Sequence, residues 1–232
     1  MELPVYETIL NILREAGFVL QVRNEVANIS GSTITTAFPN IISDTEDSAE
    51  ASKASVKVYV NGTEVEISTI DAKNGVVTLE SAPEEGSNVT VSYYYSPVTL
   101  DFVAITREDV ECAIYQKMKG VDACAPYEQS VPFAIRMITR LWAAGLLLAR
   151  EYGYNTDSEQ TSKDGYRKIQ EAKSMLEDLY KNGGACVDGV RVTDSQIDIY
   201  GGSGNVLAES QGDLFEHDYP RKHLSDDCYE RC

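Results

Sequence analysis

The amino-acid sequence predicts an α+β protein made of four segments: an N-terminal helix (residues 1–17), an antiparallel β hairpin or sandwich domain (18–100), a three-helix bundle (101–185) and an extended C-terminal arm (186–232). In the second segment apolar residues alternate with polar ones, which is the period of a strand. In the third, after Pro97, they recur every three or four residues, which is the period of a helix. In the fourth they are scattered, and no face is broad enough to form a core alone.

Composition excludes several classes of function. The chain has 232 residues, with 37 acidic against 20 basic side chains and a formal charge of -17. This balance argues against binding to nucleic-acid phosphates or to an anionic membrane surface, since both need Lys and Arg. The longest apolar run, residues 141–149, is far shorter than the roughly 20 residues that span a bilayer. The first residues lack a basic stretch followed by an apolar one, so we expect no secretory signal and a chain made in the cytoplasm.

The N-terminal segment predicts a helix followed by strands. Val5, Ile9, Leu10 and Leu13 have helical spacing, and Gly17 ends the pattern. Alternation from Phe18 onward predicts a first strand, and a Thr-rich stretch around Ile34 predicts another. Residues 43–55 are small, polar and acidic, which favours an exposed loop.

The strand signal is strongest between residues 56 and 95. Valines alternate with polar residues up to Asn61 and Gly62, a pair that accepts the positive φ angles of a type I′ hairpin turn. Asn74 and Gly75 predict a second turn, and residues 83–86 predict a loop before the last strand. These strands are expected to form a small antiparallel sheet or sandwich with one apolar face.

The first two helices of the bundle are expected directly after the β domain. Residues 106–109 (Thr-Arg-Glu-Asp) resemble a capping box, which predicts a helix that runs from there to Gly120. Pro132 predicts the start of a second helix that continues to about Tyr152. Because its apolar residues cover most of the circumference, this helix is expected to be central and buried. Residues 143–145 (Ala-Ala-Gly) are small enough to let a neighbouring backbone come close.

The third helix of the bundle is predicted to begin with Asp164 as its cap and to end at Gly183 and Gly184. Its apolar residues share one face, with charged residues on the other. Three helices joined by loops form a compact bundle.

Candidate chemistry is sparse. The sequence contains no phosphate-binding loop, nucleophile elbow or zinc-protease motif, so no catalytic, cofactor-binding or metal-ligating residue is proposed and the protein is expected not to be an enzyme. A zinc site of His223, Cys228 and Cys232 is disfavoured, because structural zinc sites use four ligands in tight pairs. The five cysteines favour free thiols in a reducing cytosol, while an inter-subunit disulfide through Cys228 and Cys232 stays open as an alternative.

Arginines and tyrosines leave further alternatives open. Arg136, Arg140 and Arg150 lie roughly on one stripe of the second bundle helix. They predict either a solvated edge or internal ion-pair row, or a contact with an acidic neighbour in an assembly. Outward tyrosines such as Tyr94 are candidates for interface anchors, because tyrosine is enriched at protein interfaces.

The helical segment combines a short helix starting at residues 106–109, a long Ala/Leu-rich helix opened by Pro132, and a Gly-Tyr-x-x-Ile-x-x-Ala-x-x-x-Leu-x-x-Leu pattern over residues 165–179 that is followed by Gly183 and Gly184. In this combination the segment resembles the head–tail connector (adaptor) proteins of tailed bacteriophages. Residues 56–96 are similar to hairpin modules of phage structural proteins. Together these parts cover half to two-thirds of the chain.

The resemblance implies a connector-type bundle and a structural, non-enzymatic virion protein at the head–tail neck. Such a subunit forms a homo-oligomeric ring, typically about twelvefold, that binds the portal protein and provides the docking surface for the tail or stopper protein. DNA would pass through the lumen without specific binding, and acidic side chains there would repel it. No cofactor and no membrane are implied.

The arm is expected to contact partners by adding a strand to an exposed sheet edge, with residues 190–200 as that strand. Apolar and aromatic residues along the arm are the expected contacts. They are Val190, Val192, Ile197, Ile199, Tyr200, Leu214, Phe215 and Tyr219.

Two other classes of function are weighed against the connector. Another phage neck or tail subunit, such as a stopper, tail terminator or baseplate component, would have the same construction and different partners. A cell-surface adhesion or carbohydrate-binding module built on the β segment would require export, for which the sequence shows no signal.

Overall fold

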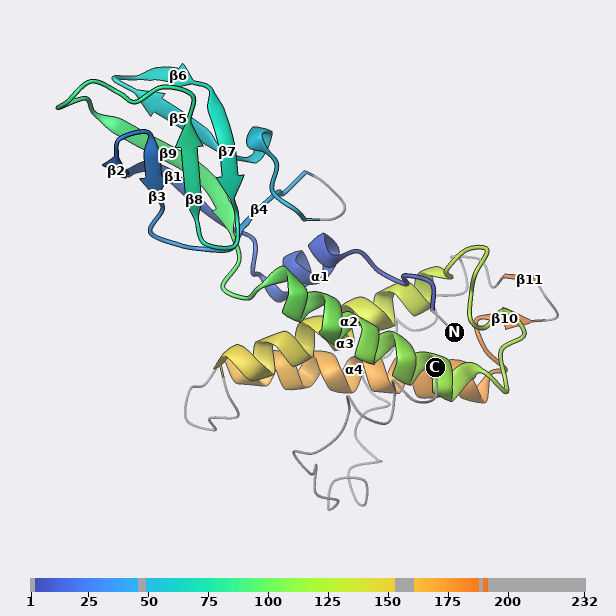
Figure 1. Cartoon of the computed structure of the whole chain (residues 1–232). Coiled ribbons are helices and arrows are strands. Elements are labelled where there is room, and N and C mark those ends of the chain that lie inside the picture. Colours follow the sequence, from blue (N-terminus) through green and yellow to red (C-terminus); the bar gives the residue numbers. More distant parts are fainter. Residues whose placement is uncertain (1–2, 46–48, 153–160, 188–189, 192–232) are drawn as a thin grey trace. The chain divides into compact units, whose positions relative to one another are not determined.

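The computed structural model describes residues 3–45, 49–152, 161–187 and 190–191 (Figure 1). Within them the chain forms four α-helices and antiparallel sheets, so the predicted α+β class is confirmed. The described residues divide into two compact units, one of residues 7–107 and 140–169 and the other of the remainder. The three long helices each contribute a part to both units.

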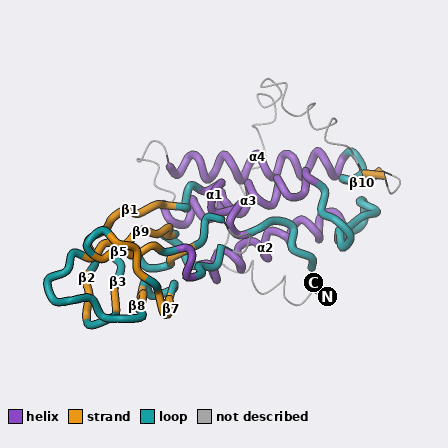
Figure 2. Tube along the Cα trace, turned by 90° about the horizontal axis from the view of Figure 1, so that it is seen from above, coloured by secondary structure: helices purple, strands orange, loops and turns teal. Residues whose placement is uncertain are grey.

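The first seventy-odd described residues after the N-terminal helix build two antiparallel sheets, seen as orange strands in Figure 2. One sheet has the strand order β1–β9–β5–β6, with β4 also paired to β9, and the other has the order β2–β3–β8–β7. Their bounds are β1 Leu20–Val26, β2 Asn28–Ser30, β3 Thr33–Thr35, β4 Ile41–Ile42, β5 Lys57–Val60, β6 Thr63–Val65, β7 Ile67–Asp71, β8 Val76–Leu79 and β9 Val89–Tyr95.

One apolar core joins the two sheets. Val58 and Val91 of the first sheet and Ile34 and Val77 of the second are fully buried and belong to the same cluster. Two sheets that share one core between their inner faces form a sandwich. The structure therefore decides between the sheet and the sandwich that the sequence left open.

The predicted hairpin turn at Asn61 and Gly62 is confirmed. Asn61 and Gly62 connect β5 to β6 with φ angles of 51° and 84°, the pair of positive values that a type I′ turn requires. Edge strand β1 carries a bulge at Asn24, whose φ is 51° and whose N–H donates to Ser92 Oγ at 3.0 Å. A bulge and exposed polar side chains on an edge strand oppose edge-to-edge pairing with another sheet.

The four helices are α1 (Ile9–Ala16), α2 (Leu100–Met118), α3 (Phe133–Tyr152) and α4 (Thr161–Lys181). Three predicted helix boundaries are confirmed. Gly17 ends α1 in the left-handed conformation, Pro132 precedes α3, and Gly184 N–H donates to Leu179 O at 2.8 Å at the end of α4.

The predicted starts of the other two long helices are wrong. Helix α2 begins at Leu100, because Thr99 caps it by accepting a hydrogen bond from Phe102 N–H at 3.3 Å. Thr106 lies inside the helix and donates to Phe102 O at 2.8 Å, so its hydroxyl is satisfied without a cap. Helix α4 begins at Thr161, which places Asp164 in the first turn, where it accepts a hydrogen bond from Arg167.

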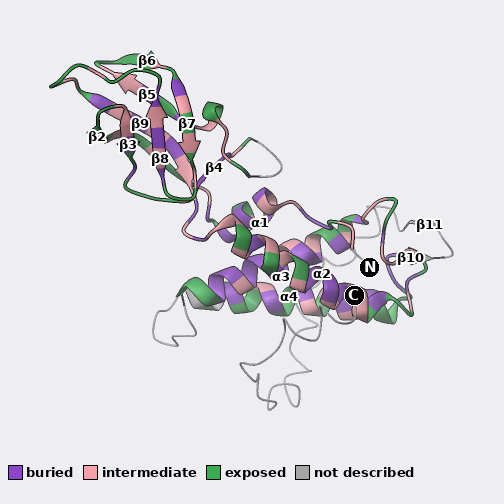
Figure 3. Cartoon of the chain, viewed as in Figure 1, coloured by how far each residue is buried: buried purple, intermediate pink, exposed green. Residues whose placement is uncertain are grey.

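Burial follows the predicted pattern in α3. Figure 3 shows buried residues along most of this helix, and Ile135, Ile138, Ala143, Ala144 and Leu147 are each 0% exposed. The prediction of a central helix with apolar residues around its circumference is confirmed. Among the helices of the described ranges, none is both long enough and apolar enough to cross a membrane.

Candidate functional site

The loop between α2 and α3 folds around the carboxylate of Asp122, which is only 4% exposed. Its Oδ1 accepts a hydrogen bond from Cys124 N–H at 2.9 Å. Its Oδ2 accepts two, from the Tyr127 hydroxyl at 2.9 Å and from Ala185 N–H at 2.6 Å. A buried carboxylate needs such donors to offset its lost hydration. Asp122 therefore joins the loop to the segment that follows α4.

The glycine pair at the end of α4 makes room for this carboxylate. Gly184 has a φ of 103°, and a Cβ at this position would lie 2.6 Å from Cβ and Cγ of Asp122. Any other residue here would need both an unfavourable backbone conformation and a displaced Asp122. Gly184 thus serves both the helix end and the approach to Asp122.

A disulfide connects the same two segments. Cys124 in the loop is bonded to Cys186, which lies 62 residues later, and their Cα atoms are 5.9 Å apart. Cys186 is 2% exposed and opens the two-residue strand β10 (Cys186–Val187), which pairs with β11 (Val190–Arg191). The hydrogen bonds of Asp122 and the disulfide together fix residues 184–187. We call Asp122, Cys124, Tyr127, Gly184, Ala185 and Cys186 the anchor.

Two buried tyrosines complete this region. The rings of Tyr6 and Tyr127 meet edge to face, with centroids 5.5 Å apart, and Tyr6 N–H donates to the buried Glu111 carboxylate at 2.6 Å. Burial, followed by the charge of Asp122, raises the pKa of the Tyr127 hydroxyl. Burial, followed by the charge of Glu111, also raises the pKa of the Tyr6 hydroxyl. Tyr127 therefore keeps its proton and remains a donor to Asp122.

The sequence-predicted arm contacts lie almost entirely outside the described residues. Val190 is in β11, where its backbone pairs with Val187. The others, and both cysteines of the proposed inter-subunit disulfide, lie beyond the described ranges; they are Val192, Ile197, Ile199, Tyr200, Leu214, Phe215, Tyr219, Cys228 and Cys232. The structure therefore describes only Val190 among these residues, in the β10–β11 hairpin next to the anchor.

Sequence reasoning missed the Cys124–Cys186 disulfide and favoured free thiols. No local signal identifies the pair, because a separation of 62 residues fits no metal or disulfide spacing pattern. A buried Asp122 carboxylate between them was equally invisible, since two of its three donors are a backbone N–H after α4 and a hydroxyl in a loop.

The predicted arginine stripe divides into separate interactions. Arg140 donates to the Glu7 carboxylate through Nη2 at 2.6 Å and Nε at 3.0 Å, and Glu7 is buried. Arg150 lies over the Phe102 ring, 3.5 Å from its centroid, and Arg136 lies 6.0 Å from that of Phe133. For Arg140 the internal ion pair, one of the two alternatives, is thus the observed one.

A loop in the β domain presents an aromatic side chain on a rigid base. Phe38 is 43% exposed and stacks on Tyr95 with centroids 4.4 Å apart and an interplanar angle of 9°. Glu25 accepts hydrogen bonds from Ala37 N–H at 2.7 Å and from the Tyr93 hydroxyl at 2.6 Å. Phe38 N–H donates to the same hydroxyl at 3.2 Å. A rigid, exposed aromatic ring of this kind suits an interface anchor.

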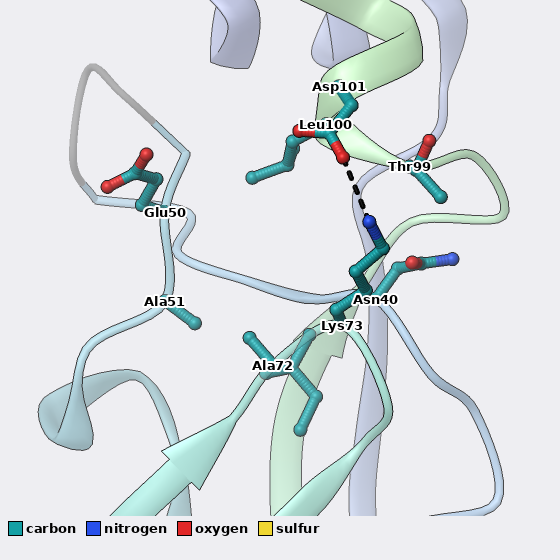
Figure 4. Close-up of a pocket in the computed structure, with 9 residues that line it drawn as sticks. Asn40, Glu50, Ala51, Ala72, Lys73, Thr99, Leu100 and Asp101 are labelled. Carbon is teal, nitrogen blue, oxygen red and sulfur yellow. Dashed lines mark hydrogen bonds and ion pairs between the residues drawn. The ribbon is translucent and has the colours of Figure 1, made fainter.

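A recess of about 290 Å³ lies between the loops of the β domain and the start of α2 (Figure 4). Ala51, Ala72 and Leu100 form its apolar lining, and Lys73 and Asp101 form an ion pair of 3.0 Å at its rim. Both ionic side chains are more than two-thirds exposed, at 69% and 76%. Solvent screens such a pair, so the recess offers little preorganised electrostatics for a ligand.

None of the known protein families, curated proteins or solved structures compared with the chain matches it.

Proposed function

We propose that the protein is a head-to-tail connector (adaptor) subunit of a tailed bacteriophage. In this proposal it forms a homo-oligomeric ring, typically about twelvefold, at the neck of the virion. The ring binds the portal protein, gives the tail or stopper protein its docking surface, and lines part of the DNA channel. The role is structural rather than enzymatic, and the chain is made in the host cytoplasm before assembly.

The observation that carries the proposal is the anchor at the start of the C-terminal segment. Residues 184–187 are held by the buried Asp122 and by the Cys124–Cys186 disulfide, so the following residues start from a fixed point. A partner-binding arm that starts from a fixed point loses less conformational entropy on binding than one attached through a free linker. An anchor at the base of the C-terminal segment would therefore favour binding of a partner by that segment.

Exposed apolar side chains supply candidate lateral contacts between ring subunits. The described residues expose several large ones by more than a third: Val5, Leu20, Val26, Ile29, Phe38, Ile105, Phe133, Tyr152, Tyr166 and Tyr180. Scattered exposed residues are common in monomers. Phe38 differs because its backbone and its stacking partner are both fixed, so it is the first residue to test for a contact between copies.

The charge of -17 fits a ring through which DNA passes. Acidic side chains facing a lumen repel the phosphates and prevent adhesion of the DNA. A ring with a neutral or basic lumen and an acidic outer surface would remove this part of the proposal.

The test begins with the mass of the purified full-length protein in solution, with and without a reductant. A ring of defined copy number supports the proposal, and a strict monomer at all concentrations, with or without portal protein, contradicts it. The internal Cys124–Cys186 bond does not change the subunit mass. A mass ladder that collapses on reduction would instead report inter-subunit bonds through other cysteines, Cys228 and Cys232 first.

The second step tests the arm. A chain that ends at Arg191 keeps the anchor and the β10–β11 hairpin, whereas a chain that ends at Gly184 would lose the disulfide and one hydrogen bond to Asp122. The chain ending at Arg191 should fold and should fail to join the portal, as seen by negative-stain imaging of mixtures. Normal joining by this chain would exclude the arm as the portal contact.

The β sandwich favours a second candidate, another neck or tail subunit such as a stopper, tail terminator or baseplate component. Two sheets with their own core form a domain larger than a connector bundle needs. The two candidates differ in partner, because a connector joins the portal directly and the others do not. Binding to isolated portal protein therefore separates them.

A further inference from the structure

We propose that the anchor is also a metal site in the reduced chain: the thiolates of Cys124 and Cys186 and the carboxylate of Asp122 bind a thiophilic divalent cation of the Zn²⁺ type. This inference does not depend on the proposed function, because it concerns only the anchor. It makes the disulfide and the metal two alternative ways to hold the same two segments together.

The ligand atoms are already close together. The two sulfur atoms and a carboxylate oxygen all lie within 4.8 Å of one another. Two thiolates on one tetrahedral zinc are about 3.8 Å apart, given Zn–S bonds of about 2.3 Å. Since the Cα atoms are 5.9 Å apart, side-chain rotation can open the sulfur pair to that spacing while the backbone stays in place.

The carboxylate is oriented and has capacity for a metal. Oδ2 of Asp122 accepts two hydrogen bonds, from Tyr127 and Ala185, and Oδ1 accepts one, from Cys124 N–H. A carboxylate oxygen has about two acceptor positions, so Oδ1 retains one. Hydrogen bonds to the other oxygen of a ligating carboxylate are the usual way in which proteins fix such a ligand.

Charge gives a reason for a cation to bind here. The three groups that donate hydrogen bonds to the buried Asp122 are all neutral: two backbone N–H groups and a tyrosine hydroxyl. A divalent ion bound to this carboxylate and to two thiolates leaves the site with a net charge of -1, the same as that of Asp122 alone, so the two new thiolates add no net buried charge. Tyr127 and Ala185 stay bound to Oδ2, so the surrounding structure need not rearrange.

The chemistry balances in two steps. A dithiol reductant gives two electrons and two protons to the Cys124–Cys186 bond, which becomes two thiols while the dithiol becomes a disulfide. Zn²⁺ then forms bonds to two sulfurs and one carboxylate oxygen and releases the two thiol protons to solvent. Water takes the fourth position of the tetrahedron.

The experiment uses the full-length protein, reduced with a dithiol that is then removed by gel filtration under nitrogen. Titration with Co²⁺ should give one bound ion per chain, with the intense absorption of thiolate-to-cobalt charge transfer, and Zn²⁺ should displace it. The oxidised protein should give no such band. No band in the reduced protein, or a band that oxidation leaves unchanged, would overturn the proposal.

Variants assign the ligands. Cys124→Ser and Cys186→Ser should each abolish the band, whereas the double variant Cys228→Ser/Cys232→Ser should keep it. Asp122→Asn should weaken Zn²⁺ binding at least tenfold, because the replacement is neutral. A band that is lost only in the Cys228→Ser/Cys232→Ser chain would place the metal elsewhere, and an unchanged affinity in Asp122→Asn would remove Asp122 from the site.

A measurement on the unaltered chain covers the case in which a serine variant fails to fold. Zn²⁺ should protect Cys124 and Cys186 of the reduced protein from alkylation by a maleimide, as read by peptide mass mapping, at least tenfold more strongly than it protects Cys228 and Cys232. Equal labelling of Cys124 and Cys186 with and without Zn²⁺ would contradict the proposal.

Discussion

Gly145 of α3 and Gly165 of α4 face each other where the two helices meet. A Cβ on Gly145 would lie 2.7 Å from the carbonyl oxygen of Gly165, and a Cβ on Gly165 would lie 2.9 Å from that of Gly145. Both distances are shorter than real Cβ atoms allow, and the obstructing atoms are backbone. The sequence predicted a close approach at the small residues around Gly145, and this prediction is confirmed.

The first prediction is that Gly145→Ala destabilises the protein. Alanine gains about 1 kcal/mol in helix propensity over glycine. Overpacking against a backbone costs about 1–3 kcal/mol, so the net change should be unfavourable. Urea unfolding followed by circular dichroism measures it. Gly120→Ala is the control, because a Cβ there meets nothing within 4 Å. If Gly145→Ala were as stable as Gly120→Ala, the close contact would be wrong.

The second prediction concerns the buried ion pair of Glu7 and Arg140, which is asymmetric. The Glu7 side chain is 3% exposed and the Arg140 side chain 32%. Arg140→Ala leaves a carboxylate buried without this cation and should cost about 3–5 kcal/mol. Glu7→Gln leaves an arginine that can reach water and keeps an acceptor for Asn11, so it should cost clearly less. Unfolding free energies of both variants test the order.

A matched control for this pair is the exposed pair of Lys73 and Asp101. Lys73→Ala should change stability by about 0.5 kcal/mol or less, because solvent screens both charges. Equal effects of Arg140→Ala and Glu7→Gln would argue against the buried geometry of Glu7.

The third prediction concerns the disulfide. Replacing both partners, as in Cys124→Ala/Cys186→Ala, removes a bond that closes a loop of 62 residues and should cost about 2–4 kcal/mol in the oxidised, metal-free protein. In a chelator and a reductant, the unaltered protein and the variant should unfold at similar urea concentrations. A difference that persists after reduction would show that the cysteines act through packing instead.

The strands and hairpin turns of the β domain could be predicted because their signals are local, whereas the choice between a sheet and a sandwich could not. Asn61 and Gly62 adopt the positive φ angles that these two residue types tolerate, and alternating valines place one face inward whatever the rest of the chain does. Helix ends were predicted equally well where a glycine or proline forces them. Thr106 failed because a threonine inside a helix can bond the carbonyl four residues earlier, which its sequence pattern does not reveal.

The anchor could not be predicted because no single segment contains it. Asp122, Cys124 and Tyr127 lie in one loop, and Ala185 and Cys186 lie about sixty residues later, after two helices. Only the packing of those helices brings the two segments together. The hydrophobic periodicity of a sequence predicts which face of a helix is buried, but it does not predict which loop lies next to the end of that helix.

The fourth prediction is a loss of stability at high pH through Tyr93. Burial, followed by the hydrogen bond to Glu25, raises the pKa of Tyr93 to about 12 from its ordinary value of 10.0. The folded state thus favours the protonated hydroxyl. The contribution of the Tyr93 hydroxyl to the free energy of unfolding is complete below pH 10. It is lost as the pH rises from 10 toward about 12, because the tyrosine of the unfolded chain ionises first.

Tyr93→Phe isolates this contribution. At pH 8 the variant should be less stable by about 1–3 kcal/mol, because Glu25 loses a donor in a half-buried site. Above pH 10 the difference from the unaltered protein should shrink, since ionised tyrosine cannot donate to a carboxylate and is repelled by it. Urea unfolding at pH 8, 9, 10 and 11 measures this stability difference, with Tyr59→Phe on β5 as the control. A difference that stays constant across this range would mean that the Tyr93 hydroxyl does not stabilise the loop through its proton.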